Sequence, residues 1–86
     1  MNPEEIKNIL QDTFPSCDIE VEEQQGKYSV LVIGEEFGGL NEVERQKKIY
    51  APLTPYITAG RIHAVTVKGC TEKERNPSPN EDLRDN

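Results

Sequence analysis

The 86-residue chain is long enough for one small domain, and its hydrophobic fraction of 34% limits the core that it can build. With 10 basic and 16 acidic side chains, its formal net charge of −6 disfavours general binding to phosphate backbones. No apolar run approaches the ~20 residues that cross a bilayer, and the acidic N-terminus lacks a secretory h-region. We therefore expect a cytoplasmic protein without a membrane segment.

The first expected element is a helix over residues 3–14. Asn2 and Glu5 have the spacing of a capping box, and Pro3 suits the first helical position. Its apolar residues recur at helical spacing, which predicts one buried stripe. They are Ile6, Ile9, Leu10 and Phe14.

Two strands of a hairpin are expected next, at residues 18–23 and 27–34. In the first strand, apolar and acidic residues alternate, which predicts one buried and one solvated face. The second strand contains the apolar run 30–33, so it is expected to be the more central strand. Gly26 supplies a residue that readily adopts positive φ in the connection.

A second helical region begins at Asn41, where Asn41 and Glu44 repeat the capping signature. Because Pro52 lies inside the apolar pattern, we predict a kink or a break there, with Pro52 opening a second helical piece. Gly60 is expected to follow the last helical turn. The last strand is expected at residues 61–68.

Residues 71–86 are predicted to be a disordered tail, because half of them are charged and only one is aliphatic. Residues 1–70 then form a single domain of the α+β class with the element order α-β-β-α-(α)-β. One three-stranded mixed sheet with the helices on one face accommodates this order.

The chain lacks a recognisable catalytic constellation. It contains no G-x-S-x-G elbow and no glycine-rich phosphate-binding loop, and its single histidine excludes motifs that need two. We therefore predict that the protein is not an enzyme. The two cysteines, Cys17 and Cys70, are too few for a disulfide framework and fit a reducing compartment.

His63 has two interpretations. Strand parity places it on one face with Val65 and Val67, where it would be a partly buried histidine with a hydrogen-bonded ring. Alternatively, it is a metal ligand at the start of the strand. A single imidazole cannot hold a metal alone, so this second interpretation requires ligands from another molecule.

The only basic cluster is formed by Arg45, Lys47 and Lys48, which could contact phosphate. The alternative is that Glu44 pairs with Lys47 and Lys48 along the helix, and we prefer this alternative. Nucleic acid is therefore an unlikely partner.

Three segments together resemble the BolA family, in its YrbA/IbaG-like branch. The resemblance covers about residues 3–70, and Ile62-His63-Ala64 is its most specific part. The segments are Phe37-Gly38-Gly39-Leu40-Asn41, Gln46-Lys47-Lys48-Ile49-Tyr50-Ala51-Pro52-Leu53 and Arg61-Ile62-His63-Ala64-Val65-Thr66-Val67-Lys68.

The resemblance implies a fold similar to class II KH domains and a non-enzymatic protein that pairs with a monothiol glutaredoxin. In such pairs a [2Fe–2S] cluster is shared with glutaredoxin and glutathione, and His63 corresponds to the ligand from this side. No cofactor is then bound tightly by the chain alone, which would be a monomer or weak homodimer connected with stress responses. The implied partner interface consists of Gly38, Gly39, Arg61, Ile62 and His63.

The chain departs from the family pattern in two places. Many members supply a second ligand, Cys or His, from the hairpin connection, but residues 22–28 contain neither. Glu42 and Glu44 stand at a helix start that is often basic in relatives, which opposes phosphate binding. Two other functions stay open: a DNA-binding transcriptional regulator, or a metal-free interaction domain that docks through the surface around His63 and the Gly38-Gly39 link.

Overall fold

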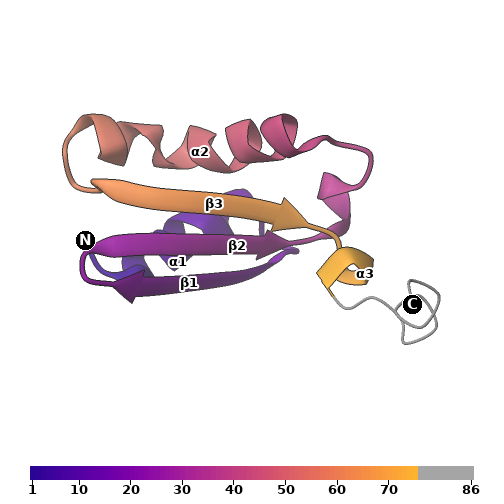
Figure 1. The fold of residues 1–86 in the computed structure, drawn as a ribbon, viewed down its shortest axis with the longest axis horizontal. Coiled ribbons are helices and arrows are strands. Elements are labelled where there is room, and N and C mark those ends of the chain that lie inside the picture. The colour runs from indigo at the N-terminus through magenta and orange to yellow at the C-terminus, as the bar shows by residue number, and fades with distance from the viewer. Residues whose placement is uncertain (76–86) are drawn as a thin grey trace, which may run out of the picture.

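The structure, a computed structural model, describes residues 1–75 and has the predicted α+β class (Figure 1). Within these residues, three helices and a short 3-10 helix accompany three strands. In chain order the elements are α1 (Pro3–Thr13), β1 (Asp18–Gln24), β2 (Lys27–Ile33), η1 (Glu35–Phe37), α2 (Glu42–Thr58), β3 (Ala64–Cys70) and α3 (Glu72–Arg75).

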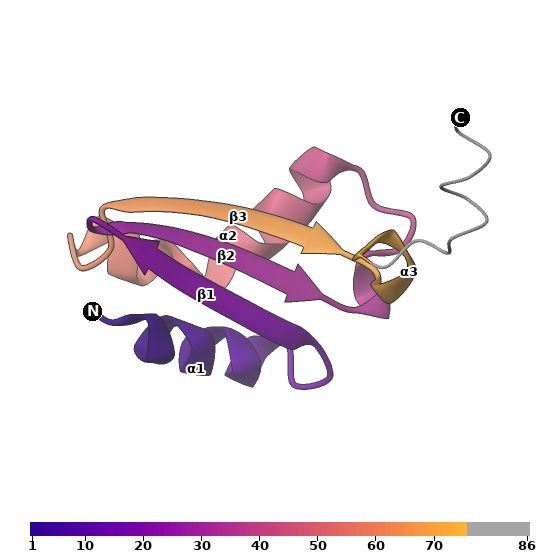
Figure 2. The same ribbon diagram turned by 60° about the horizontal axis from the view of Figure 1, so that its bottom comes forward.

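The three strands form one mixed sheet in the order β1-β2-β3. β1 pairs with β2 antiparallel, and β2 pairs with β3 parallel, so β2 is the central strand as predicted. Both long helices pack on one face of the sheet; α1 lies behind it in Figure 1 and below it in Figure 2. Among residues 1–75, α3 is the helix that lies toward the opposite face, at one end of the sheet.

Both long helices begin at the predicted capping boxes. The Asn2 side chain accepts from the amide of Glu5 at 2.8 Å, and Asn41 accepts from the amide of Glu44 at the same distance. Each glutamate returns a bond to the backbone amide of its asparagine, which satisfies two helix-end donors. Local side-chain chemistry therefore sets where α1 and α2 start.

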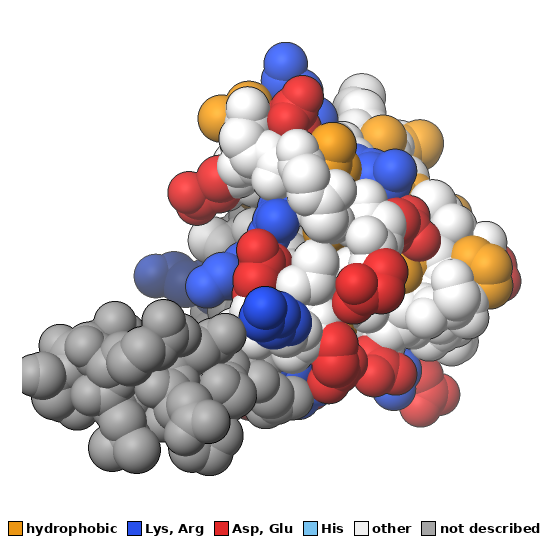
Figure 3. Space-filling model, turned by 90° about the vertical axis from the view of Figure 1, so that its right-hand side faces the viewer, with side chains coloured by type: hydrophobic (Ala, Val, Ile, Leu, Met, Phe, Trp, Pro, Cys, Tyr) orange, Lys and Arg blue, Asp and Glu red, His pale blue; other side chains and the backbone are white. Residues whose placement is uncertain are grey.

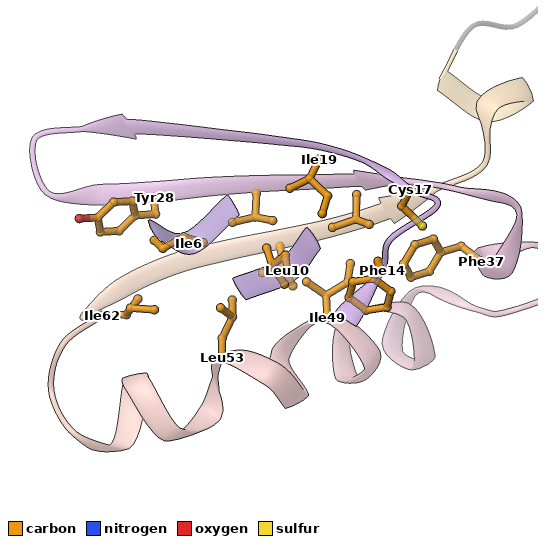
Figure 4. Close-up of a cluster of buried hydrophobic side chains, with 13 residues drawn as sticks. Ile6, Leu10, Phe14, Cys17, Ile19, Tyr28, Phe37, Ile49, Leu53 and Ile62 are labelled. Atoms are coloured by element: carbon orange, nitrogen blue, oxygen red, sulfur yellow. The ribbon is translucent and has the colours of Figure 1, made fainter. Parts of the chain in front are cut away.

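The core lies between the helices and the sheet (Figure 4). α1 contributes its predicted stripe, and alternate residues of each strand point toward it because side chains alternate across a strand. The outward residues of β1, such as Glu20 and Glu22, are exposed. The buried cluster is formed by Ile6, Leu10, Phe14, Cys17, Ile19, Tyr28, Val30, Val32, Phe37, Ile49, Leu53, Ile62 and Val67.

The predicted break at Pro52 is wrong, because α2 runs unbroken from Glu42 to Thr58 and contains both Pro52 and Pro55. Ile49 and Leu53, on the two sides of Pro52, are both fully buried. This packing offsets the helical hydrogen bonds that the prolines cannot donate.

The last strand begins three residues later than predicted, at Ala64. Residues 59–62 instead close the C-terminus of α2, where Gly60 has a φ of +78° and its amide donates to Ile57 O at 3.0 Å. The amide of Arg61 donates to Tyr56 O at 2.9 Å, which completes a Schellman motif. Gly60 thus follows the helix as predicted, but the turn consumes the start of the expected strand.

The predicted disordered tail is wrong for residues 71–75. Thr71 is buried, and Glu72–Arg75 form α3. The Glu74 amide donates to Thr71 Oγ1 at 3.2 Å, while a Glu74 carboxylate oxygen accepts from the Thr71 amide at 2.8 Å. The rest of the predicted tail, 76–86, lies outside the described residues.

Candidate functional site

His63 lies between the Schellman turn of α2 and the first residue of β3, and its side chain is exposed. The preceding residue, Ile62, points the other way and is only 1% exposed. The ring stands close to Gly60, since a Cβ built on that glycine would lie 4.0 Å from His63 Cε1. The predicted grouping of His63 with Val65 and Val67 on one buried strand face is therefore wrong, because the strand has not yet begun at residue 63.

The β1–β2 turn lies beside His63. β2 and β3 pair in parallel with Lys27 opposite Ala64, so Gly26 and His63 are next to each other at the same end of the sheet. Gln25 and Gly26 form the turn, with φ values of 54° and 80°. The turn that lies beside His63 therefore contains neither Cys nor His.

The cysteines lie at the opposite end of the sheet from His63. Cys17 packs on Gly34, and the amide of Gly34 donates to Cys70 O at 2.9 Å. The stretch of β2 from Gly26 to Gly34 spans ~26 Å at about 3.3 Å per residue. Neither thiol can therefore share a metal with His63 within one chain.

Both cysteines are buried thiols. Burial, together with a 3.4 Å hydrogen bond from Cys17 Sγ to the Glu36 carboxylate, raises the pKa of Cys17 from 9.0 to about 11. Burial and the nearby Glu74 carboxylate also raise the pKa of Cys70. Because a reactive cysteine needs a lowered pKa, these groups are structural in the folded chain.

The predicted partner interface is not one surface. Arg61 and His63 are exposed at one end of the sheet. Gly38 and Gly39 follow η1 at the other end, where a Cβ on Gly38 would lie 3.7 Å from Thr71 Cγ2. Ile62 belongs to the core. His63 and the Gly38-Gly39 link therefore lie at opposite ends of the sheet, and a partner would have to span its length to contact both (Figure 1).

The basic cluster is not a free cationic patch. Arg45 donates to Gly69 O at 3.2 Å and forms two bonds with the Glu74 carboxylate, at 2.7 and 3.1 Å. Lys48 lies 3.8 Å from a carboxylate oxygen of Glu36, and only Lys47 points away from these contacts into solvent. The predicted pairing of Glu44 with the lysines is not formed, because the Glu44 carboxylate accepts from the amide of Asn41.

The Arg45–Glu74 pair was missed in the sequence. Charge density alone suggested a disordered tail, whereas Thr71 and Glu74 carry the same three-residue capping spacing as the starts of α1 and α2. That spacing could have indicated a helix here. Nothing in the sequence indicates that Arg45 is the residue that pairs with Glu74.

The donor set of this site is a single exposed imidazole. Among residues 1–75, no group of three or more His, Cys, Asp and Glu side chains has an arrangement that could hold a metal ion. No helix of the described part is long and apolar enough to cross a membrane. Within residues 1–75, His63 therefore has no companion ligands, so the other ligands of a metal site would have to come from outside this part of the chain.

The comparisons with known proteins agree with this fold. Residues 5–74 match the family described as BolA-like protein. The chain is 39% identical over 74 residues to an uncharacterized protein of Acinetobacter guillouiae, covering 86% of this chain and 89% of the relative. It is 34% identical over 74 residues to the acid stress protein IbaG of Escherichia coli K12, covering 86% and 88% of the two chains.

Among solved structures, a BolA homologue from Coxiella burnetii superposes with a TM-score of 0.75 at 20% identity, over 87% of this chain and 96% of that one. BolA1 from Arabidopsis thaliana superposes with a TM-score of 0.71 at 21% identity, over 92% of this chain and 99% of that one. These likenesses support the fold, and the sequence matches support the IbaG-like branch. The chain belongs to the BolA-like protein family.

Proposed function

We propose that the protein is a non-enzymatic, cytoplasmic adaptor in iron–sulfur cluster trafficking that pairs with a monothiol glutaredoxin. In this pairing His63 is the one ligand that the chain contributes to a shared [2Fe–2S] cluster, while the glutaredoxin and glutathione supply the others. The carrying observation is the exposed His63 side chain at the start of β3, beside the β1–β2 turn.

The geometry favours a ligand role over a core role for His63. The neighbouring Ile62 fills the core position, which leaves the imidazole at the surface. An imidazole must be neutral to coordinate, so a bond through His63 would be sensitive to protonation. Replacing thiolate by imidazole also raises the reduction potential of such clusters.

The missing second ligand defines how this adaptor differs from many relatives. The turn residues Gln25 and Gly26 lie beside His63 but offer no thiolate or imidazole. Binding of the shared cluster would therefore depend on His63 and on the partner, and we expect it to be reversible.

The test is a titration of cluster-loaded monothiol glutaredoxin, with glutathione present, followed by visible absorption and circular dichroism. Wild type should change the spectrum, and His63→Ala should abolish the change without altering the fold. Lys27→Ala is a matched control, because Lys27 is exposed at the same end of the sheet and is not a proposed ligand. An unchanged spectrum with wild type, or a change that survives His63→Ala, would refute the ligand role.

The two other functions predict different results. A metal-free interaction domain would bind glutaredoxin under metal-free conditions, with no cluster present. A DNA-binding regulator would bind duplex DNA in a salt-dependent way through Arg45, Lys47 and Lys48. The structure gives little support to the DNA alternative, because the Arg45 side chain already bonds Glu74 and Gly69.

A further inference from the structure

The outer face of the sheet carries a second, smaller group of apolar residues at the end where α3 lies. Ile33 and Cys70 pair with each other in the sheet and are 2% and 6% exposed, yet both lie outside the main core cluster. Strand parity places them on the outer face with Leu31. Leu31 and Cys70 line a cavity of about 370 Å³ together with Glu74 and Arg75 of α3.

The segment over this cluster is held by polar contacts. α3 has only four residues, and none of them is buried. A helix of this length has no independent stability, because nucleation of the first turn is unfavourable. Its position must therefore come from its contacts with the rest of the fold.

Among the contacts that hold the segment in place, three involve Thr71, Glu74 and Arg75. Glu74 pairs with Arg45 at the start of α2, and Arg75 pairs with Glu20 on the outer face of β1. Thr71 and Glu74 close the capping box that shapes the turn. Two of the three contacts are ion pairs at the surface, which salt screens. Figure 3 faces this end of the molecule, where acidic and basic side chains are interspersed around the described surface.

We propose that Thr71–Arg75 form an electrostatically latched strap that opens without unfolding of the domain and thereby exposes Leu31, Ile33 and Cys70. The latch consists of the Arg45–Glu74 and Glu20–Arg75 ion pairs. Opening uncovers an apolar patch on an otherwise polar sheet face, and it converts Cys70 from a shielded into an accessible thiol. The strap acts at the end of the sheet remote from His63, so it is independent of the proposed cluster ligand.

The two cysteines provide an internal comparison for this opening. Cys17 belongs to the main core cluster and Cys70 lies under the strap, so only Cys70 should become accessible by local opening. The experiment uses the full chain and measures the labelling rate of each thiol by N-ethylmaleimide with mass spectrometry of the peptides. When opening and closing are faster than labelling, the rate reports the population of the open strap.

Glu20→Gln is the informative variant, because it removes one ion pair of the latch and leaves the surroundings of Cys70 unchanged. Glu74→Gln can keep the capping-box acceptor, but it removes one acceptor of the Arg45 pair and the carboxylate that raises the pKa of Cys70, so it tests the latch less directly. We expect Glu74→Gln and Glu20→Gln each to raise the Cys70 labelling rate by a factor of about 1.4 to 5, the scale of one exposed ion pair. Added salt should raise the wild-type Cys70 rate in the same direction. The Cys17 rate should stay unchanged in every case.

Glu22→Gln is the matched control for Glu20→Gln. Both glutamates are exposed on the outer face of β1, but the structure pairs Arg75 with Glu20. Glu22→Gln should leave the Cys70 rate at the wild-type value. The strap is refuted if Glu20→Gln leaves the Cys70 rate unchanged, or if Cys17 and Cys70 accelerate together, which indicates opening of the whole domain.

Discussion

The contact between Cys17 and Gly34 yields the sharpest stability prediction. A Cβ built on Gly34 would lie 2.3 Å from Cys17 Sγ and 3.3 Å from Cys17 Cβ, so Gly34→Ala requires the buried thiol to move. The thiol is 5% exposed and bonds Glu36, which limits its freedom to relax. Overpacking of this kind costs about 1–3 kcal/mol. In a domain of this size, 1 kcal/mol lowers the melting temperature by about 4–8 °C.

A second substitution at Cys17 should rescue the first. Cys17→Ala removes Sγ, the atom in closest approach, and by itself costs about 1 kcal/mol for the lost buried group. In the Cys17→Ala background we expect Gly34→Ala to cost about 1–2 kcal/mol less than in wild type. Urea unfolding of wild type, both single variants and the double variant measures this coupling.

Cys70→Ala serves as the control for this cycle. Cys70 is also a buried cysteine next to Gly34, but its side chain lies on the outer face of the sheet. The cost of Gly34→Ala should be the same with and without Cys70→Ala. If the unfolding free-energy changes of Gly34→Ala and Cys17→Ala simply add in the double variant, the Cys17 thiol does not occupy the space above Gly34. The packing role assigned to Cys17 would then be wrong.

Three further predictions concern capping and titration. Asn41→Ala should lower the free energy of unfolding by about 1 kcal/mol in urea titrations, because it removes the capping bond to the Glu44 amide. The Arg45 guanidinium holds the pKa of Glu74 at about 2, below its usual 4.5. The ionised Glu74 carboxylate therefore stabilises the folded state fully above pH 4.5, and this contribution is lost as the pH falls toward 2. Urea midpoints of wild type and Glu74→Gln should therefore differ at neutral pH and converge near pH 2, whereas a constant difference would contradict this. Because the pKa of Cys17 is raised to about 11, this thiol should show no thiolate absorbance in the folded protein at pH 9. Raising the pH from 9 toward 11 should lower the free energy of unfolding, because the thiol ionises more readily in the unfolded chain.

The features that the sequence predicted correctly are those set by local chemistry. The capping pairs at Asn2 and Asn41 act within one helical turn, and Gly60 acts through its own backbone conformation. β2 is the central strand as predicted, and its continuous apolar run fits because Val30 and Val32 are buried on one face and Ile33 on the other. These signals do not depend on the rest of the chain.

The features that the sequence misplaced depend on contacts between distant residues. α2 continues through Pro52 because Ile49 and Leu53 are both held in the core. α3 is held in place by contacts with distant residues, such as the pair of Glu74 with Arg45. Likewise, no local pattern shows that Gly38 and His63 end up at opposite ends of the sheet, since that separation follows from strand pairing.

This separation leads to a last prediction, which joins the two proposals. The His63 end and the strap end are ~26 Å apart along β2 at about 3.3 Å per residue, and the rigid sheet between them offers no second arrangement that could couple them. Glu74→Gln should therefore leave the glutaredoxin titration unchanged, and His63→Ala should leave the Cys70 labelling rate unchanged. A glutaredoxin that slows Cys70 labelling would show that its footprint extends over the strap, and the two ends of the sheet would then have to be treated as one binding surface.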